Sequence, residues 1–186
     1  MIWFPGAYDG AQSFVDQGFA VAVAKRGTSL DLLFVDLEMA HLQDRGPIER
    51  LRSEIILPAR TAGASTWLGG ISLGGLLALD YASSYPGEVD GLCLLAPYLG
   101  NRMLIDEVAA GRLAEFDAEH RIWRYIKSQI HAAPIYLGYG RQDRFSRAHD
   151  LMAATLPAKR VDVVDGGHDW RTWFELWERF LDLRCL

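Results

Sequence analysis

Gly69-Gly70-Ile71-Ser72-Leu73-Gly74-Gly75 is the stretch that decides the fold, because the chain changes there from strand-like to helix-like. The apolar run Thr66-Trp67-Leu68 precedes it, and residues 73–82 follow it with helical spacing. The pattern G-x-S-x-G at such a junction is typical of a sharp turn that presents a serine hydroxyl. Small flanking residues let the strand and the helix approach closely around the strained serine. The new helix would direct its free N–H groups at any negative charge that develops beside Ser72.

The same glycine-rich turn is compatible with two other roles. It can serve packing alone, or it can bind a phosphate group on its backbone N–H groups. The motif does not decide between these roles, so the partners of Ser72 must be sought elsewhere in the chain.

Composition indicates one globular domain, residues 1–186, since half of the residues are hydrophobic and 23% are charged. The net charge of −5 argues against a nucleic-acid partner, because phosphate contacts need clustered Lys and Arg. Cys93 and Cys185 provide neither a disulfide framework nor zinc-ligand spacing. We see no membrane span and no signal peptide. We therefore expect a cytoplasmic protein with no metal and no cofactor, and the oligomeric state stays open.

Apolar runs that alternate with amphipathic segments predict a six-stranded parallel sheet covered by helices on both faces. Strands are expected at residues 2–4, 30–35, 89–95, 135–139 and 160–164, and the strand-like run 66–68 leads into the turn of Ser72. Helices are expected at residues 11–26, 47–61, 73–84 and 169–183, with helical content around 103–115 and 118–130. The nearly all-apolar strand 30–35 should be buried on both faces. The aromatic stripe of the last helix, from Trp170 to Trp177, is interpreted as core rather than as a ligand cradle.

Ligands of parallel sheets bind beyond the carboxyl ends of the strands, so the loops that follow the strands hold the candidate chemistry. A serine hydroxyl is a poor nucleophile at neutral pH and needs a base within hydrogen-bond reach. Among the five histidines, only His168 lies just past a strand in the right place, in Gly166-Gly167-His168-Asp169-Trp170. His41 follows the second strand and either lines the pocket or is an ordinary loop histidine. His120, His131 and His149 are interpreted as solvated or packing residues.

The base needs an acid that orients it, and Asp143 is our candidate. It follows the fifth strand in the stretch LGYGRQD (residues 137–143). Asp165 and Asp169 are so close to His168 in sequence that reaching its Nδ1 would be awkward, and Asp150 lies in the next helix. A loop aspartate can also serve as a turn or cap residue, which is the alternative for Asp143.

Ser72, Asp143 and His168 stand in the order Ser–Asp–His, each after a parallel strand, and this arrangement resembles the α/β-hydrolase fold. The resemblance covers nearly the whole chain, from about Ile2 to Leu181. It implies the strand order 2-1-3-4-5-6 and an oxyanion hole built from the backbone N–H groups of Ala7 and Leu73. Two departures are visible. Pro5 stands where many members have a histidine, and the first two strands of the family are missing.

The resemblance implies a serine hydrolase that acts on a small-molecule carboxylic ester or thioester through Ser72, His168 and Asp143. Tyr8, His41 and Tyr98 would line the pocket, and residues 97–133 form either a small lid or a decorated crossover. The alternative is a non-catalytic member of the fold that holds a ligand or a partner. A fold does not determine the reaction, so peptide, carbon–carbon bond, and cofactor-free halide or peroxide chemistry stay open as well.

Overall fold

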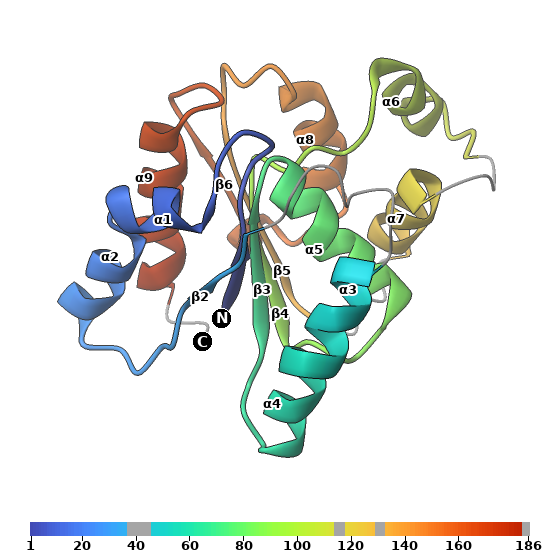
Figure 1. The fold of residues 1–186 in the computed structure, drawn as a ribbon. Helices are drawn as coiled ribbons and strands as arrows, with labels where there is room; N and C mark the ends of the chain where they lie inside the picture. Colours follow the sequence, from blue (N-terminus) through green and yellow to red (C-terminus); the bar gives the residue numbers. More distant parts are fainter. Residues whose placement is uncertain (37–45, 114–117, 129–132, 184–186) are drawn as a thin grey trace.

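A single parallel sheet forms the centre of the molecule (Figure 1). The computed structural model describes residues 1–36, 46–113, 118–128 and 133–183. The strands are β1 (Ile2–Phe4), β2 (Leu33–Phe34), β3 (Trp67–Ile71), β4 (Gly91–Leu95), β5 (Ile135–Gly140) and β6 (Val161–Val164). Every neighbouring pair is parallel, and the spatial order is β2-β1-β3-β4-β5-β6. The predicted six-stranded sheet and its strand order are therefore confirmed.

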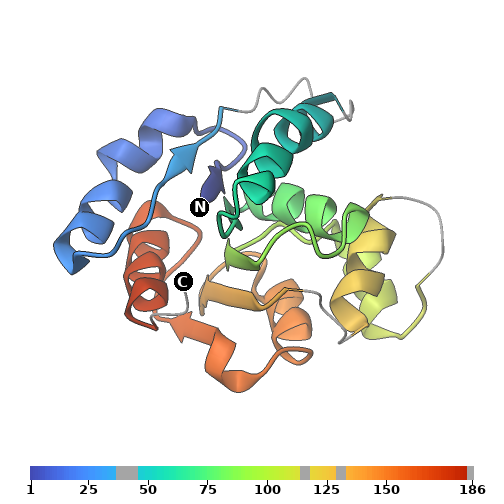
Figure 2. The same ribbon diagram turned by 90° about the horizontal axis from the view of Figure 1, so that it is seen from below.

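Helices cover both faces of the sheet, as Figures 1 and 2 show. One face carries α1 (Ala11–Asp16), α2 (Phe19–Arg26) and α9 (Trp170–Asp182). The other face carries α3 (Gly46–Leu51), α4 (Leu57–Thr61), α5 (Leu73–Ser84), α7 (Ala118–Lys127) and α8 (Ser146–Ala153). Helix α6 (Arg102–Ala109) lies above α7 in Figure 1. The molecule is thus a sandwich of three layers.

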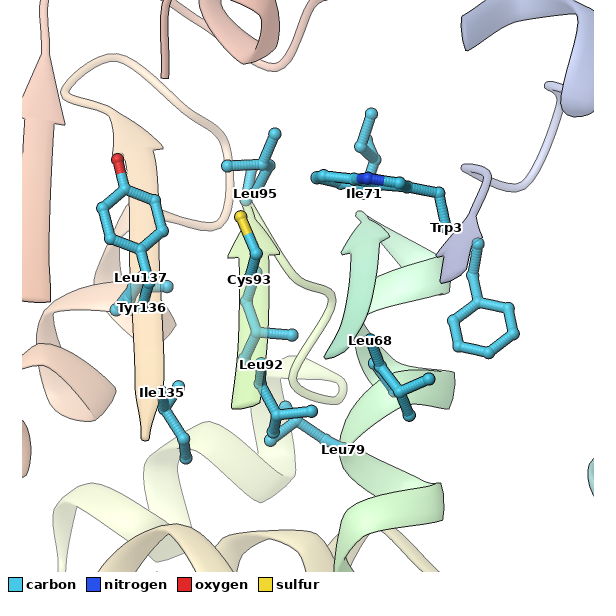
Figure 3. Close-up of a cluster of buried hydrophobic side chains, with 14 of the residues drawn as sticks. Trp3, Leu68, Ile71, Leu79, Leu92, Cys93, Leu95, Ile135, Tyr136 and Leu137 are labelled. Carbon is cyan, nitrogen blue, oxygen red and sulfur yellow. The ribbon is translucent and has the colours of Figure 1, made fainter. Parts of the chain in front are cut away.

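The core consists of buried side chains from the strands and from the helices that cover them, and Figure 3 shows part of it. Strands β3, β4 and β5 are buried along their whole length, as the apolar runs predict. Cys93 lies in the middle of β4, where it is a free and fully buried cysteine. This hydrophobic burial holds the sheet rigid, and so fixes the positions of the loops that leave its edge.

The expected helix 11–26 is two helices instead of one. Gly18 between them has a φ of 83°, in the left-handed region that glycine adopts without strain. The chain turns there, and the ring of Phe19 reaches the core under β1, where it meets Trp3 edge to face. Gly27 ends α2 with a φ of 60°, as its position after Lys25 and Arg26 predicts.

The helix expected at 47–61 contains a wide turn. Residues Arg52–Ile56 are π-helical, and the Leu57 N–H bonds to the Arg52 carbonyl five residues back. Pro58 follows directly and has no N–H to continue an α-helical ladder, which accounts for the change of register.

Strand β2 differs most from its prediction. It comprises only two residues, and Leu33 is 41% exposed, so the expectation of a strand buried on both faces was wrong. The physical reason is its place at the edge of the sheet, where β1 is its only partner among the described strands.

The remaining boundaries shift only slightly. Strands β4 and β6 begin at Gly91 and Val161, later than expected, and β5 extends to Gly140. Within residues 97–133, the described part holds α6 and α7, and the idea that this region acts as a lid stays a prediction. Since all strands run in the same direction, the loops after β1, β3, β4, β5 and β6 gather at the upper edge of the sheet in Figure 1.

Candidate active site

Ser72 occupies a strained turn between β3 and α5. Its φ of 53° and ψ of −115° lie in a region that residues with a side chain rarely adopt. Such strain persists only where the surroundings hold the residue firmly. Here the Ser72 N–H donates to the Leu95 carbonyl at 3.1 Å, and the Ser72 carbonyl accepts from the Tyr98 N–H at 2.8 Å. The end of β4 therefore holds the serine backbone from both sides.

The glycines around Ser72 allow strand and helix to touch. A Cβ atom on Gly70 would lie 2.2 Å from the Gly74 carbonyl oxygen, closer than real Cβ atoms come. A Cβ atom on Gly74 would lie 2.1 Å from the Phe4 carbonyl oxygen at the end of β1. The spacing G-x-S-x-G thus has a local steric cause, and it brings the end of β1 beside the serine.

A chain of two hydrogen bonds connects three loops at the sheet edge. The His168 Nε2 lies 2.9 Å from the Ser72 Oγ, and the His168 Nδ1 lies 2.7 Å from the Asp143 Oδ2. A carboxylate only accepts, so Nδ1 carries a hydrogen toward Asp143, and in the neutral form of the imidazole the lone pair of Nε2 then faces the serine hydroxyl. This geometry can deprotonate a hydroxyl during nucleophilic attack.

The Asp143 carboxylate is buried and ionised. Its side chain has no exposed surface, and burial alone would raise its pKa. The hydrogen bond from His168 and a 2.8 Å bond from the Phe145 N–H to Oδ1 outweigh this effect, so the pKa of Asp143 is lowered. The imidazole is held edge to face by Phe145 at 5.1 Å and by Trp173 at 5.0 Å between ring centres. Packing and hydrogen bonding therefore orient the ring together.

The competing acids and histidines are engaged elsewhere. The Asp150 carboxylate accepts from the Tyr139 hydroxyl at 2.6 Å, and exposed Asp165 pairs with Arg141. Asp169 caps α9 by accepting from the Thr172 N–H at 2.9 Å. His120 lies 3.3 Å from Glu107. His131 and His41 lie outside the described residues.

The turn after β1 lies against the serine. A Cβ atom on Gly6 would be 3.8 Å from the Ser72 Cβ, which puts Ala7 one residue from that contact. The turn is closed by a bond from the Asp9 N–H to the Gly6 carbonyl at 3.2 Å. Asp9 Oδ1 also accepts from the Trp170 indole at 3.2 Å, which connects this turn to the loop that carries His168.

Two backbone N–H groups in this corner are available to a ligand. Leu73 is the first residue of α5, where helical N–H groups have no partner within the helix. Within the described part of the chain, neither the Leu73 N–H nor the Ala7 N–H makes a hydrogen bond. Both groups come from segments that flank Ser72, and these positions are compatible with binding an oxyanion.

The expected pocket-lining residues have different surroundings. Tyr8 is 97% exposed, whereas Tyr98 is half-buried and meets Phe145 edge to face at 5.5 Å. Phe145 is a residue that sequence reasoning missed, although its position two residues after Asp143 was a usable signal. His149, which was interpreted as a solvated or packing residue, is fully buried and packs on Tyr139. Its Nε2 lies 2.9 Å from the Pro97 carbonyl in the loop that follows β4.

The fold and the site together define an α/β-hydrolase. Residues 55–179, about two thirds of the chain, match the Esterase family model, described as "Putative esterase". The chain therefore belongs to this family of esterases and is a hydrolase. No curated protein sequence matches the chain significantly. None of the helices in the described residues is long and apolar enough to cross a membrane.

Several solved structures of similar fold are hydrolases of low sequence identity to this chain. The fluorophosphonate-binding serine hydrolase FphF of Staphylococcus aureus, determined with substrate bound, is 14% identical with a TM-score of 0.69, and the match covers 98% of this chain and 81% of that one. The S-formylglutathione hydrolase FrmB of the same organism is 13% identical with a TM-score of 0.64, over 98% and 79% of the two chains. A predicted CIB-like hydrolase of Thermoplasma acidophilum is 18% identical with a TM-score of 0.61, over 100% and 86%.

Proposed function

We propose that this esterase cleaves small-molecule carboxylic esters or thioesters with Ser72 as nucleophile, His168 as general base and Asp143 as the orienting acid. The observation that carries the proposal is the unbroken path of hydrogen bonds from the Ser72 Oγ through His168 to the buried Asp143 carboxylate. No competing acid or histidine in the described residues lies at hydrogen-bond distance from this path.

The reaction would proceed in two halves. In the first, Ser72 Oγ bonds to the carbonyl carbon while His168 Nε2 takes the hydroxyl proton, and Asp143 stabilises the imidazolium. His168 then gives that proton to the leaving alcohol or thiol as its bond to carbon breaks. In the second half, the oxygen of water bonds to the acyl carbon while His168 Nε2 takes a proton from it. His168 then returns that proton to Ser72 Oγ as the bond from Oγ to the acyl carbon breaks and the carboxylic acid leaves.

The Ala7 and Leu73 N–H groups are our proposed oxyanion hole. The tetrahedral intermediate carries a negative charge on the former carbonyl oxygen, and fixed backbone donors stabilise it without reorganising. Support comes from the place of both groups beside Ser72 and from the positive end of the α5 dipole. Thioesters are included because the similar structure FrmB is an S-formylglutathione hydrolase. A cytoplasmic location also belongs to the proposal.

Labelling with a fluorophosphonate tests the nucleophile. The probe should phosphonylate Ser72 Oγ with loss of fluoride, which peptide mass mapping would locate. Ser72→Ala should fold normally, escape labelling and lose kcat for p-nitrophenyl acetate by about 10⁴-fold or more, because the triad acts as a unit. Ser53→Ala, which removes an exposed helical hydroxyl that bonds only to neighbouring carbonyls, is the matched control.

Turnover by Ser72→Ala within tenfold of the wild type would refute the assignment. A folded wild type that neither labels nor turns over would favour the ligand-binding alternative.

A further inference from the structure

The loop that follows β4 is itself strained. Ala96 has a φ of 48°, and it shares a positive φ only with Ser72 among the described residues other than glycine. The strained loop and the strained serine are bonded to one another through the Tyr98 N–H and the Ser72 carbonyl. Pro97 lies between Ala96 and Tyr98 in the chain and packs on α5. A Cβ atom on Gly75 of that helix would come within 2.6 Å of the Pro97 ring. The strained backbone conformations of Ser72 and Ala96 therefore depend on the contacts that hold this loop in place.

Two contacts hold the loop from the side of β5 and α8. The Ala96 N–H donates to the Gly138 carbonyl at 2.7 Å, which continues the pairing of β4 with β5. The second contact is made by a side chain, since His149 on α8 has its Nε2 2.9 Å from the Pro97 carbonyl oxygen. A carbonyl only accepts, so this nitrogen carries the hydrogen and donates it.

His149 is fully buried and neutral. Its ring packs on Tyr139 with the ring centres 5.0 Å apart, and burial lowers the pKa of its imidazole. Its Nδ1 makes no hydrogen bond within the described part of the chain. Such a buried, unpaired nitrogen is unfavourable, so packing alone would be served better by an apolar ring. The single bond that the imidazole makes is the one to the loop that holds Ser72.

We propose that His149 is a positioning residue for the nucleophile, which it holds through the Pro97 carbonyl and the Tyr98 N–H. This inference rests on the proposed role of Ser72. Helix α8 begins three residues after Asp143, so one rigid element would position the acid and, through His149, the serine. Without the donor, the loop can relax and the bond from the Tyr98 N–H to the Ser72 carbonyl is lost. The Ser72 carbonyl then keeps only its bonds from the Gly75 and Leu76 N–H groups of α5, and the Ser72 Oγ moves away from His168 Nε2. A misplacement of about 1 Å between reacting groups lowers the rate about 10²-fold.

The test compares variants with and without a donor at this position. His149→Phe and His149→Leu remove the donor and keep apolar volume, whereas His149→Gln keeps an amide N–H that can reach the Pro97 carbonyl. We expect both donorless variants to lose kcat by about 10- to 100-fold with KM within twofold, and His149→Gln to stay within about threefold of the wild type. Rates are referred to the active sites titrated in each preparation, so that partial unfolding does not count as slow catalysis.

A control separates positioning from the stability of α8. Tyr139→Phe removes the 2.6 Å hydrogen bond from the Tyr139 hydroxyl to Asp150, which lies on α8 as His149 does. The substitution leaves the contact between His149 and the Pro97 carbonyl in place. It should lower the melting temperature and leave kcat unchanged. A residue with a purely structural role would behave like Tyr139, because each folded molecule would keep full activity.

The rate of fluorophosphonate labelling at Ser72 decides whether His149 positions the nucleophile. Slow labelling of His149→Phe and His149→Leu, with wild-type labelling of His149→Gln, supports the proposal. Equal labelling of the wild type and the donorless variants would overturn the role of His149 alone. Labelling of His149→Gln as slow as that of His149→Phe would also overturn it, because the donor would then not matter. A wild type that is not labelled at Ser72 would overturn the proposed nucleophile itself.

Discussion

At the scale of single residues, Asp143 shows how a charge is kept inside this protein. Removing a carboxylate from water is costly, and it is tolerated only where strong donors replace the water. Here an imidazole N–H and a backbone N–H fill that role on the two oxygens. Both donors are also parts of the site, because Phe145 follows Asp143 and contacts the ring of His168. The charge is thus stabilised by the groups that it orients.

Replacing this carboxylate by an amide should separate activity from folding. Asp143→Asn should lower kcat by roughly 10³- to 10⁴-fold, since the amide no longer selects the imidazole tautomer that faces Ser72. Asp165→Asn is the control, because Asp165 is exposed and pairs only with Arg141 among the described residues. Steady-state kinetics of both variants check this.

The same pair predicts how stability depends on pH. The pKa of Asp143 in the folded chain lies below its ordinary value of 3.8, so its ionised form is stabilised by folding. That contribution is fully present above the unfolded pKa and is lost as the pH falls through the folded one. The free energy of unfolding of the wild type should therefore exceed that of Asp143→Asn by a constant amount near neutrality. Urea unfolding should show this difference shrinking below about pH 4, and a difference that grows in acid would contradict the argument.

At the scale of elements, glycine decides how close α5 comes to the sheet. Gly74→Ala would put a Cβ atom 2.1 Å from a main-chain oxygen of β1, and neither element can move without disturbing the other. We expect a loss of roughly 1–3 kcal/mol of unfolding free energy by overpacking. Activity per folded molecule should fall too, because the end of β1 and Ser72 would separate. For the loss of stability, Gly167→Ala is the control, since its Cβ would meet only the Asp169 carboxylate, at 3.3 Å.

The apolar pattern of the sequence predicted the positions of strands and helices better than the points at which a helix is interrupted. The alternation of apolar runs and amphipathic segments was sufficient for the six strands and the helices, whereas the order of the strands was implied by the resemblance to the α/β-hydrolase fold. It did not predict the turn at Gly18, because apolar side chains continue on both sides of that glycine. Strand β2 was overestimated for a related reason. An apolar run does not tell whether a strand lies inside a sheet or at its edge.

The site was predictable to the extent that it depends on topology. Ser72, Asp143 and His168 each follow a parallel strand, so their meeting at one edge of the sheet follows from the strand order. Contacts such as that of His149 with Pro97 could not be foreseen. They depend on the angle at which α8 crosses the sheet and on the left-handed backbone of Ala96, and neither leaves a pattern in the sequence.

At the scale of the whole molecule, a cluster of aromatic rings joins the two ends of the chain. Trp177 of α9 stacks on Phe19 of α2 at 5.4 Å and meets Trp3 of β1 edge to face at 5.1 Å. Its indole N–H donates to the Phe19 carbonyl at 3.1 Å. The same helix begins beside His168, so the packing of this face also supports the loop that carries the base.

Truncating the centre of this cluster should weaken the whole domain. Trp177→Ala should lower the free energy of unfolding by about 3–5 kcal/mol, because the side chain is fully buried and leaves a cavity. Phe174→Ala, one turn away and only half-buried, should cost clearly less. Urea unfolding followed by circular dichroism measures both values. Equal losses for the two variants would show that the cluster is not a centre of stability.

The buried thiol of Cys93, in the middle of β4, can report how often the central strands of the sheet become exposed to solvent. Burial raises the pKa of its thiol well above the ordinary value, and the reactive thiolate forms only when solvent reaches the strand. In a chain whose tail cysteine, Cys185, has been replaced by serine, a disulfide reagent can therefore modify the protein only at the pace at which β4 becomes exposed. The modification rate then reports how often the centre of the molecule opens under native conditions, without denaturant and independently of the substrate.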